Sequence, residues 1–192
     1  MTLASHNRGK WAEFMRLVEP FGVTLTVPEP SPSDLVEETG STYLENARLK
    51  AVTMARTLGV WTLADDSGVE VDALGGLPGV QSARFVSDDP WENTREILLR
   101  LMEVPWPRRT ARMVAVVVLA APDGRYWWAE GRVEGRILLW PRGTRGFGVD
   151  PIFSVDGVRS LAEVDDAEKD ACSHRGEAVR RLFGGHAIPG AE

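Results

Sequence analysis

The sequence predicts an α/β protein in which a mixed β-sheet is flanked by helices. In the N-terminal half, segments with apolar residues at helical spacing alternate with short apolar runs. The uninterrupted apolar run at 113–121 is typical of a central strand that is covered on both faces. A Pro-Asp-Gly turn at 122–124 leads into a further strand at 126–133, which adds a hairpin to the series. Together these patterns favour a mixed sheet over a purely parallel one.

The first half of the chain contains five expected elements. They are a strand at 2–4, a helix at 8–18, a strand at 22–27, a helix from Thr42 to Gly59 and a strand at 60–64. Prolines alternate over 28–32 and exclude regular structure there. Thr42 and Glu45 have the spacing of a capping box, which fixes the start of the second helix.

The second half contains two helices around the hairpin strands. Asp89-Pro90 opens a helix at 91–102, and Ser173 opens a final helix that ends at Gly184. No repeat, low-complexity tract or linker divides the sequence, so we expect one domain over 1–192 with two lobes.

Composition and charge exclude several classes of protein. The longest apolar run is half the length needed to cross a bilayer, and the N-terminus has no signal peptide pattern, so we expect a soluble, cytoplasmic protein without a membrane partner. A net charge of −6 argues against a nucleic-acid partner. The single cysteine, Cys172, allows no internal disulfide. The sequence has three lysines against nineteen arginines, so each lysine marks a place where a compact ammonium could be required.

The loop at 5–10 (SHNRGK) is a candidate anion site. It consists of small and polar residues and opens the first helix, so backbone N–H groups and the positive end of the helix dipole would face a ligand. Lys10 adds a full charge. The loop lacks the first glycine of a Walker A motif, and the alternative is an ordinary Asn-Gly-type turn with an exposed lysine.

Two acidic clusters lie next to predicted elements, and the second of them is a candidate metal site. One is the segment at 37–40 (EETG), and the other is Asp65-Asp66, which follows an apolar strand and precedes Ser67-Gly68. Adjacent carboxylates repel each other unless a cation or a proton offsets their charge. A few carboxylates of this kind suit Mg²⁺ that is bound jointly with substrate phosphates. An Asp-Asp-Ser-Gly surface turn is the alternative.

A fourth polar cluster lies near the C-terminus. Glycines at 146 and 148 would let the backbone approach a ligand closely, and Phe147 offers a flat face for a base. Ser173-His174-Arg175 opens the last helix, with Lys169 just upstream. Of the three histidines, only His174 has such neighbours.

In this order, the segments resemble the inosine triphosphatase family of non-standard purine nucleoside triphosphate pyrophosphatases. The matching pieces are LASHNRGKWAEF, EETGSTYLENARLKA, LADDSGVEVDALGGLPGVQSARF, GFGVDPIF and SHRGEA. The resemblance covers nearly the whole chain. It implies an elongated mixed α/β fold with the active site in a cleft between two lobes. It also implies a cytoplasmic homodimer that needs Mg²⁺ and hydrolyses ITP, dITP and XTP to the monophosphate and pyrophosphate.

The resemblance also implies a role for each matching residue. Asp66 would be the catalytic proton acceptor, and Mg²⁺ would be held by Glu37 and Asp66 with support from Asp65. The substrate would be bound by Ser5, His6, Asn7, Arg8, Gly9, Lys10, Lys50, Ser67, Phe147, Gly148, Val149, Asp150, Lys169, His174 and Arg175. His174 and Arg175 would read the 6-oxo edge of the purine. His6 and Val149 depart from the residues that the family commonly has at these positions, which puts the breadth of substrate choice in question.

Three other functions fit parts of the sequence. A Maf-type pyrophosphatase would act on modified pyrimidine nucleotides, but the SHR segment and the loop at 147–150 favour a purine. A catalytically silent nucleotide-binding module is opposed by the carboxylates Glu37, Asp65 and Asp66 beside phosphate. An arginine-rich nucleic-acid binder is opposed by the net charge.

Overall fold

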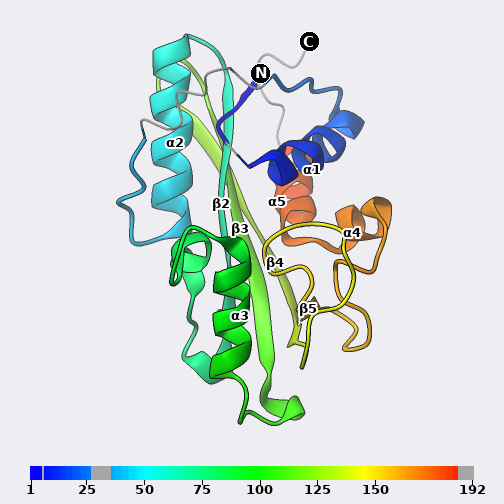
Figure 1. Cartoon of the computed structure of the whole chain (residues 1–192). Helices are drawn as coiled ribbons and strands as arrows, with labels where there is room; N and C mark the ends of the chain where they lie inside the picture. Colours follow the sequence, from blue (N-terminus) through cyan, green and yellow to red (C-terminus); the bar gives the residue numbers. More distant parts are fainter. Residues whose placement is uncertain (6, 27–35, 186–192) are drawn as a thin grey trace. The chain divides into compact units, whose positions relative to one another are not determined.

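The computed structural model describes residues 1–5, 7–26 and 36–185, and the chain divides into two compact units (Figure 1). The first unit is formed by residues 1–66, 115–131 and 174–192, and the second by residues 67–114 and 132–173. The prediction of a single domain over 1–192, with a cleft between two lobes, stays a prediction.

The predicted mixed β-sheet is confirmed. Its five strands are ordered β1-β2-β3-β4-β5, with bounds Thr2–Leu3, Thr62–Val71, Thr110–Ala120, Tyr126–Ile137 and Phe153–Ser154. β1 pairs with β2 in parallel, with Thr2 opposite Thr62, whereas β4 pairs with β5 antiparallel. The hairpin turn forms as the sequence indicates, because Ala121 N–H donates to the Arg125 carbonyl across it.

The helices are α1 (Arg8–Val18), α2 (Tyr43–Leu58), α3 (Pro90–Arg100), α4 (Asp166–Cys172) and α5 (His174–Gly184). All were expected except the short α4. The capping box at Thr42 and Glu45 is present, and Gly59 ends α2 in the left-handed conformation, with φ at 66°. Among the described residues, no helix is long and apolar enough to span a membrane.

Two predicted strands differ from the structure. The strand at 22–27 is reduced to a single bridge between Thr26 and Thr2, and residue 27 lies outside the described residues. β2 was expected to end before Asp65, but it continues through both aspartates to Val71. Apolar side chains resume at Val69 and Val71, and the acidic residues between find polar partners, so the strand is not interrupted.

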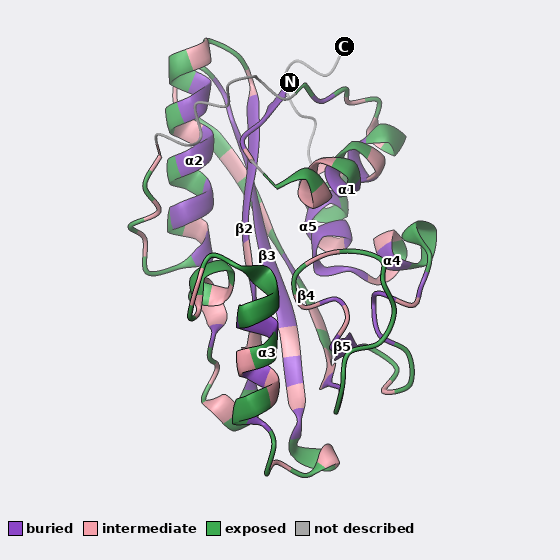
Figure 2. Ribbon diagram, in the orientation of Figure 1, coloured by how far each residue is buried: buried purple, intermediate pink, exposed green. Residues whose placement is uncertain are grey.

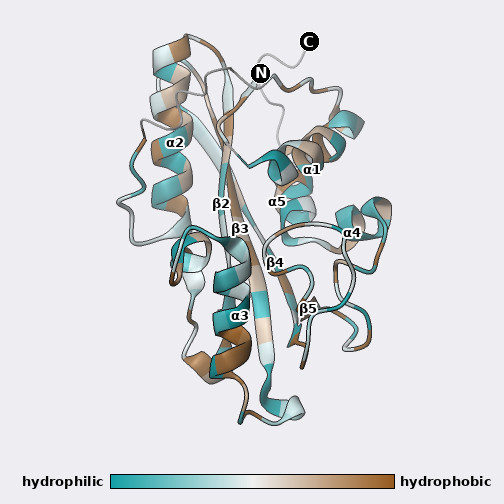
Figure 3. Cartoon of the chain, in the orientation of Figure 1, coloured by the Kyte–Doolittle hydropathy of each residue, from teal (hydrophilic) through white to brown (hydrophobic). Residues whose placement is uncertain are grey.

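Helices of the first unit cover both faces of its strands. α1 and α5 contact each other, and their residues Phe14, Val18 and Val179 share a buried core with Leu63 of β2 and Val117 of β3. Figure 1 shows α2 on the opposite side of β2 from α1 and α5. β2 is buried along nearly its whole length (Figure 2), and β3 carries the hydrophobic run that the sequence indicated (Figure 3).

The second unit has a core of its own. Val71, Ile97, Ile137, Ile152 and Phe153 pack together there. Val149 packs against this core from the loop before β5.

Candidate active site

In the loop before α1, side chains accept hydrogen bonds from the backbone amides of the same loop. Asn7 caps the helix, and its Oδ1 accepts from Gly9 N–H at 2.8 Å and from Lys10 N–H at 3.2 Å. The expectation that these amides are open to an anion is therefore wrong for this conformation. Ser5 Oγ accepts from Asn7 N–H at 3.2 Å, Arg8 is exposed, and His6 lies outside the described residues. Lys10 extends from this loop to Asp65 of β2.

Asp65 binds two cations from two different helices. Lys10 Nζ donates to its two oxygens at 2.8 and 2.9 Å, and Arg175 Nε donates to Oδ2 at 3.1 Å. The Asp65 side chain is 1% exposed. Burial by itself would raise the pKa of Asp65, but the charges of Lys10 and Arg175 outweigh it and hold that pKa well below its usual range. Asp65 is thus a fixed anion, and this geometry disfavours its predicted role as a metal ligand.

Arg175 and His174 lie at the start of α5, where that helix touches β4. A Cβ on Gly131 of β4 would lie 2.0 Å from the His174 carbonyl oxygen, so only glycine allows this approach. Both side chains are buried, His174 to 1% and Arg175 to 4% exposure. Arg175 Nη1 also donates to Glu13 Oε2 of α1 at 3.3 Å. The sequence indicated two donors for a ligand, and the structure adds that Arg175 is held by two carboxylates.

Asp66 faces α2. Asn46 Nδ2 donates to Asp66 Oδ2 at 3.1 Å, and Asn46 Oδ1 accepts from Gly40 N–H at 2.7 Å. Burial raises the pKa of Asp66, with a further contribution from the charge of Glu38, while Lys50 and Lys10 act against the rise. Asn46 was not predicted as a site residue, although its place one turn before Lys50 on the same helix is visible in the sequence.

The two aspartates have opposite environments because they are neighbours in a strand. Successive side chains of a β-strand point to opposite faces of the sheet. Asp65 therefore meets the cations of α1 and α5, and Asp66 meets the amide and the cation of α2. Lys10 and Lys50 act electrostatically on both carboxylates, but each carboxylate has its own hydrogen-bond partners.

The acidic segment before α2 contributes Glu38 to this region. Lys50 Nζ donates to Glu38 Oε1 at 2.5 Å, and both side chains are largely buried. Glu37 is exposed. The family resemblance implied Glu37 as the metal ligand of this segment, and that assignment stays a prediction, but Glu38 is a carboxylate whose charge reaches Asp66.

In the second unit, Asp150 organises the glycine-containing loop. Its Oδ2 accepts from Lys169 Nζ at 2.6 Å and from Phe147 N–H at 2.8 Å, with Asp150 2% and Lys169 4% exposed. Lys169 Nζ also lies 4.9 Å from the centre of the Phe147 ring. A Cβ on Gly146 would lie 2.1 Å from Asp150 Oδ2, which explains the glycine at this position. Phe147, Asp150 and Lys169 therefore form one cluster within the second unit, whereas His174 and Arg175, which the sequence grouped with them, belong to the first unit.

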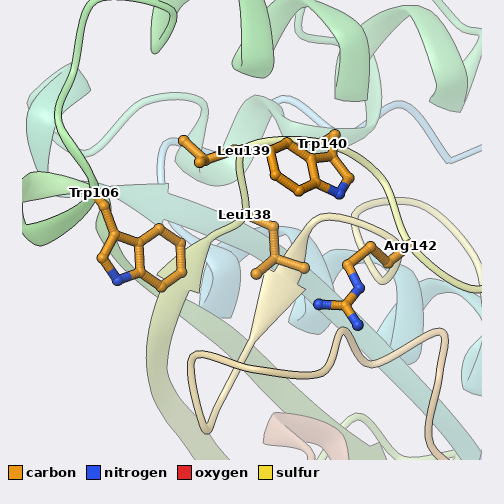
Figure 4. Close-up of a pocket in the computed structure, with 5 residues that line it drawn as sticks. All are labelled: Trp106, Leu138, Leu139, Trp140 and Arg142. Carbon is orange, nitrogen blue, oxygen red and sulfur yellow. The ribbon is translucent and has the colours of Figure 1, made fainter.

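The remaining predicted residues of the second unit are Gly148, Val149 and Ser67. Gly148 is exposed, and its carbonyl lies 3.2 Å from Thr94 Oγ1 of α3. Val149 packs into the core, and Ser67 is a partly buried residue of β2. Figure 4 shows a separate pocket of this unit, lined by Trp106, Leu138, Leu139, Trp140 and Arg142, and none of these is a predicted site residue.

The described residues offer few candidate ligands for a metal ion. Within the described part of the chain, no three His, Cys, Asp or Glu side chains lie together as a ready metal site. On the α2 side of β2, the carboxylate of Glu38 lies close enough for its charge to raise the pKa of Asp66.

Comparison with known proteins shows that nearly the whole chain matches one protein family. A family model described as the Ham1 family matches residues 1–184. A "dITP/XTP pyrophosphatase" of Symbiobacterium thermophilum is 45% identical over 183 residues, which are 95% of this chain and 92% of that protein. A protein of the same name from Nitratidesulfovibrio vulgaris is 44% identical over 194 residues, with 95% and 93% covered.

Solved structures agree with this match. The Staphylococcus aureus Ham1 protein superposes with a TM-score of 0.81 at 34% identity, over 96% of both chains. A nucleoside-triphosphatase, dITP/XTP pyrophosphatase, of Mycobacterium abscessus superposes with a TM-score of 0.72 at 40% identity, over 98% of this chain and 97% of that one. The resemblance on which the site residues were predicted is thereby confirmed.

Proposed function

Because this chain belongs to the Ham1 family, we propose that it is a nucleoside triphosphate pyrophosphatase that hydrolyses dITP, ITP and XTP. The products are the nucleoside monophosphate and pyrophosphate, so the reaction removes non-standard purines from the nucleotide pool. The names of the relatives support this choice of substrates over the modified pyrimidines of a Maf-type enzyme.

The observation that carries the proposal is the pair of neighbouring aspartates with opposite environments. Asp65 stays ionised between Lys10 and Arg175, whereas burial raises the pKa of Asp66. Titratable groups whose pKa values are pushed apart mark the acid–base assignments of an active site. Asp66 is the group that can accept a proton, and Asp65 is the group that orients cations.

The residues around Asp66 fit a magnesium ion. Glu38 and Asp66 offer carboxylate oxygens, and two such ligands suffice for Mg²⁺ when substrate phosphates supply others. The ion would neutralise the triphosphate and polarise the phosphorus atom under attack. Glu37 remains the ligand that the resemblance implies, and the electrostatic effect of Glu38 on Asp66 supports Glu38 as an alternative ligand.

The catalytic steps of the protein itself follow from this arrangement. Asp66 accepts a proton from a water molecule that attacks the α-phosphorus. Asn46 holds the carboxylate in place, because its Nδ2 donates to Asp66 Oδ2. Lys10 and Lys50 bind the phosphates, with Ser5, Asn7 and Ser67 as further polar contacts. Both lysines are ion-paired with carboxylates here, so the triphosphate shares their charge with Asp65 and Glu38.

The base is recognised by the cluster of Phe147, Asp150 and Lys169 and by residues at the start of α5. Phe147 stacks on the purine, and the buried Asp150–Lys169 pair fixes the loop that carries it. His174 and Arg175 donate to the 6-oxo group.

We expect kcat/KM to be highest for ITP and XTP, much lower for GTP, and lowest for ATP. Adenine presents a 6-amino donor, and a donor that faces a buried donor loses about 1–3 kcal/mol, or roughly a tenfold to a hundredfold in affinity. Guanine keeps the 6-oxo group, so only crowding at its 2-amino group can reject it. Pyrophosphate release from each triphosphate, measured with Mg²⁺, tests this order, and Arg175→Ala should flatten it. Equal hydrolysis of ATP and ITP by the unmodified protein would contradict the donor assignment.

Lys10→Ala should lower kcat/KM by about 10- to 100-fold, because a charged hydrogen bond to the departing pyrophosphate is lost. Lys10→Arg should also be impaired, since the planar guanidinium does not replace a compact ammonium between Asp65 and the phosphates. Arg16→Ala removes a positive charge from the same helix and serves as the control. Steady-state kinetics that show Lys10→Arg equal to the unmodified protein would remove Lys10 from phosphate binding.

The proposal also covers the oligomeric state and the cellular location of the protein. We expect a homodimer in the cytoplasm, with the purine nucleoside triphosphate as its small-molecule partner. Sedimentation equilibrium of the purified protein distinguishes a dimer from a monomer of 21.1 kDa.

A further inference from the structure

Four charged side chains of the first unit form a continuous chain of ion pairs, and all of them except the partly exposed Lys10 are buried. Lys10 binds Asp65, Asp65 binds Arg175, and Arg175 binds Glu13, with closest distances of 2.8, 3.1 and 3.3 Å. The side chains of Asp65, Arg175 and Glu13 are only 1%, 5% and 2% exposed. Glu13 is the member of this chain that the predicted active site does not include.

The negative charge of Glu13 balances the charges in this chain of ion pairs. Lys10 and Arg175 carry two positive charges, and Asp65 alone carries one negative charge to meet them. A charge that is buried without a partner is expensive, and Glu13 supplies the second negative charge. Glu13 and Lys10 are three residues apart on α1, so both lie on the helix face that meets Arg175 and Asp65.

The geometry at Arg175 shows what Glu13 adds beyond charge. The guanidinium is a planar group with donors in fixed directions. Asp65 accepts from Nε and Glu13 accepts from Nη1, so the group is held at two positions along its rim. Two such contacts fix both the plane and the direction of the guanidinium, whereas Asp65 alone would leave it free to turn about one contact.

We propose that Glu13 is a positioning residue for purine selectivity, which orients Arg175 so that its guanidinium meets an oxo group of the base. This inference rests on the proposed function, in which Arg175 reads the base. Glu13 does not touch the substrate, and it acts through Arg175.

The test compares Glu13→Gln, Arg175→Ala and the double variant. Glu13→Gln keeps the size of the side chain and an acceptor atom but removes the charge. We expect it to lower the ratio of kcat/KM for ITP to that for ATP by about 10- to 100-fold, mainly through the loss on ITP. Affinity for inorganic tripolyphosphate, measured by calorimetry, should not fall, because the change removes a negative charge near the phosphates. The double variant should be no less selective than Arg175→Ala alone, since both changes remove the same contact.

Leu17→Ala is the matched control for a purely structural role. Leu17 is a buried residue of the same helix with no part in the ion-pair chain, so its truncation should lower the melting temperature and leave the ITP-to-ATP ratio unchanged. An unchanged ratio in Glu13→Gln beside a reduced ratio in Arg175→Ala would overturn the proposal and leave the proposed function intact.

A binding measurement keeps the two claims separate. If the unmodified protein hydrolyses none of the triphosphates, the proposed function fails, and calorimetry with IMP and AMP decides the role of Glu13 without turnover. A preference for IMP that is lost in Glu13→Gln supports the positioning role. The same IMP-to-AMP ratio in both proteins overturns it.

Discussion

Replacing Asp65 with asparagine is expected to lower the free energy of unfolding by about 3–5 kcal/mol, because it leaves the buried Arg175 and the partly buried Lys10 without their shared carboxylate. The amide of asparagine keeps the shape but offers only one acceptor oxygen and no charge. Urea denaturation followed by circular dichroism measures the change. Asp123→Asn is the control, since Asp123 pairs with Arg125 at the surface, and its replacement should leave the denaturation midpoint unchanged.

The effect of Asp65 should depend on pH in a defined direction. Its pKa in the folded protein lies below the ordinary aspartate value, so the stabilisation is present above that ordinary value and is lost as the pH falls through the folded-state pKa. The difference in stability between the unmodified protein and Asp65→Asn should therefore shrink at strongly acidic pH. Equal stability of the two proteins at neutral pH would show that the ion pairs contribute nothing.

Asp66→Asn is expected to have the opposite profile, with a loss of turnover and a gain in stability. Removal of a general base typically costs about 10²–10⁴-fold in kcat. The neutral amide avoids the cost of burying a charge, and it can still meet Asn46. Steady-state kinetics at saturating Mg²⁺ measure the first effect, and near-normal kcat would remove Asp66 from the mechanism. The fold should be kept, as circular dichroism can verify.

The pH dependence of this second variant follows from the raised pKa of Asp66. A carboxyl whose folded-state pKa is raised has no effect on stability below the ordinary aspartate value, destabilises the protein increasingly as the pH rises above that value, and does so fully once the pH exceeds the folded-state pKa. The stability advantage of Asp66→Asn should hence be absent in strong acid and grow as the pH rises. An advantage that is constant across the pH range would contradict the burial argument.

Local signals in the sequence predict the helices well. The capping box of α2 and the glycine at its end place that helix within a residue or two of its bounds in the structure. The helix expected at 8–18 likewise matches the bounds of α1 in the structure. These signals depend on a few residues in contact within one turn, so they can be read without knowledge of the tertiary structure.

The path of β2 could not be predicted in this way. An Asp-Asp-Ser-Gly stretch has low strand propensity and suggests a turn, yet the strand continues because Lys10, Arg175 and Asn46 meet the two carboxylates from both faces. These partners are far away in the sequence, up to 110 positions from Asp65. Tertiary contacts therefore override the local preference at the point where the site is built.

The same limit applies to the site residues. The family resemblance identified Asp65, Asp66, Lys10 and Arg175, but it did not show that the aspartates point to opposite faces of a strand. Glu13 looks like an ordinary helical glutamate in the sequence, and only its burial beside Arg175 distinguishes it. Which of two adjacent glutamates turns toward Lys50 depends on the backbone before α2, and no pattern in the sequence favours Glu38 over Glu37.

The most direct test of the central claim is hydrolysis of dITP in ¹⁸O-labelled water with Mg²⁺. Attack of an Asp66-activated water on the α-phosphorus predicts that the label enters dIMP and that the pyrophosphate released with it is unlabelled. Mass spectrometry of the products reads both at once. Labelled orthophosphate together with dIDP, labelled pyrophosphate, or no hydrolysis at all would contradict the proposed reaction.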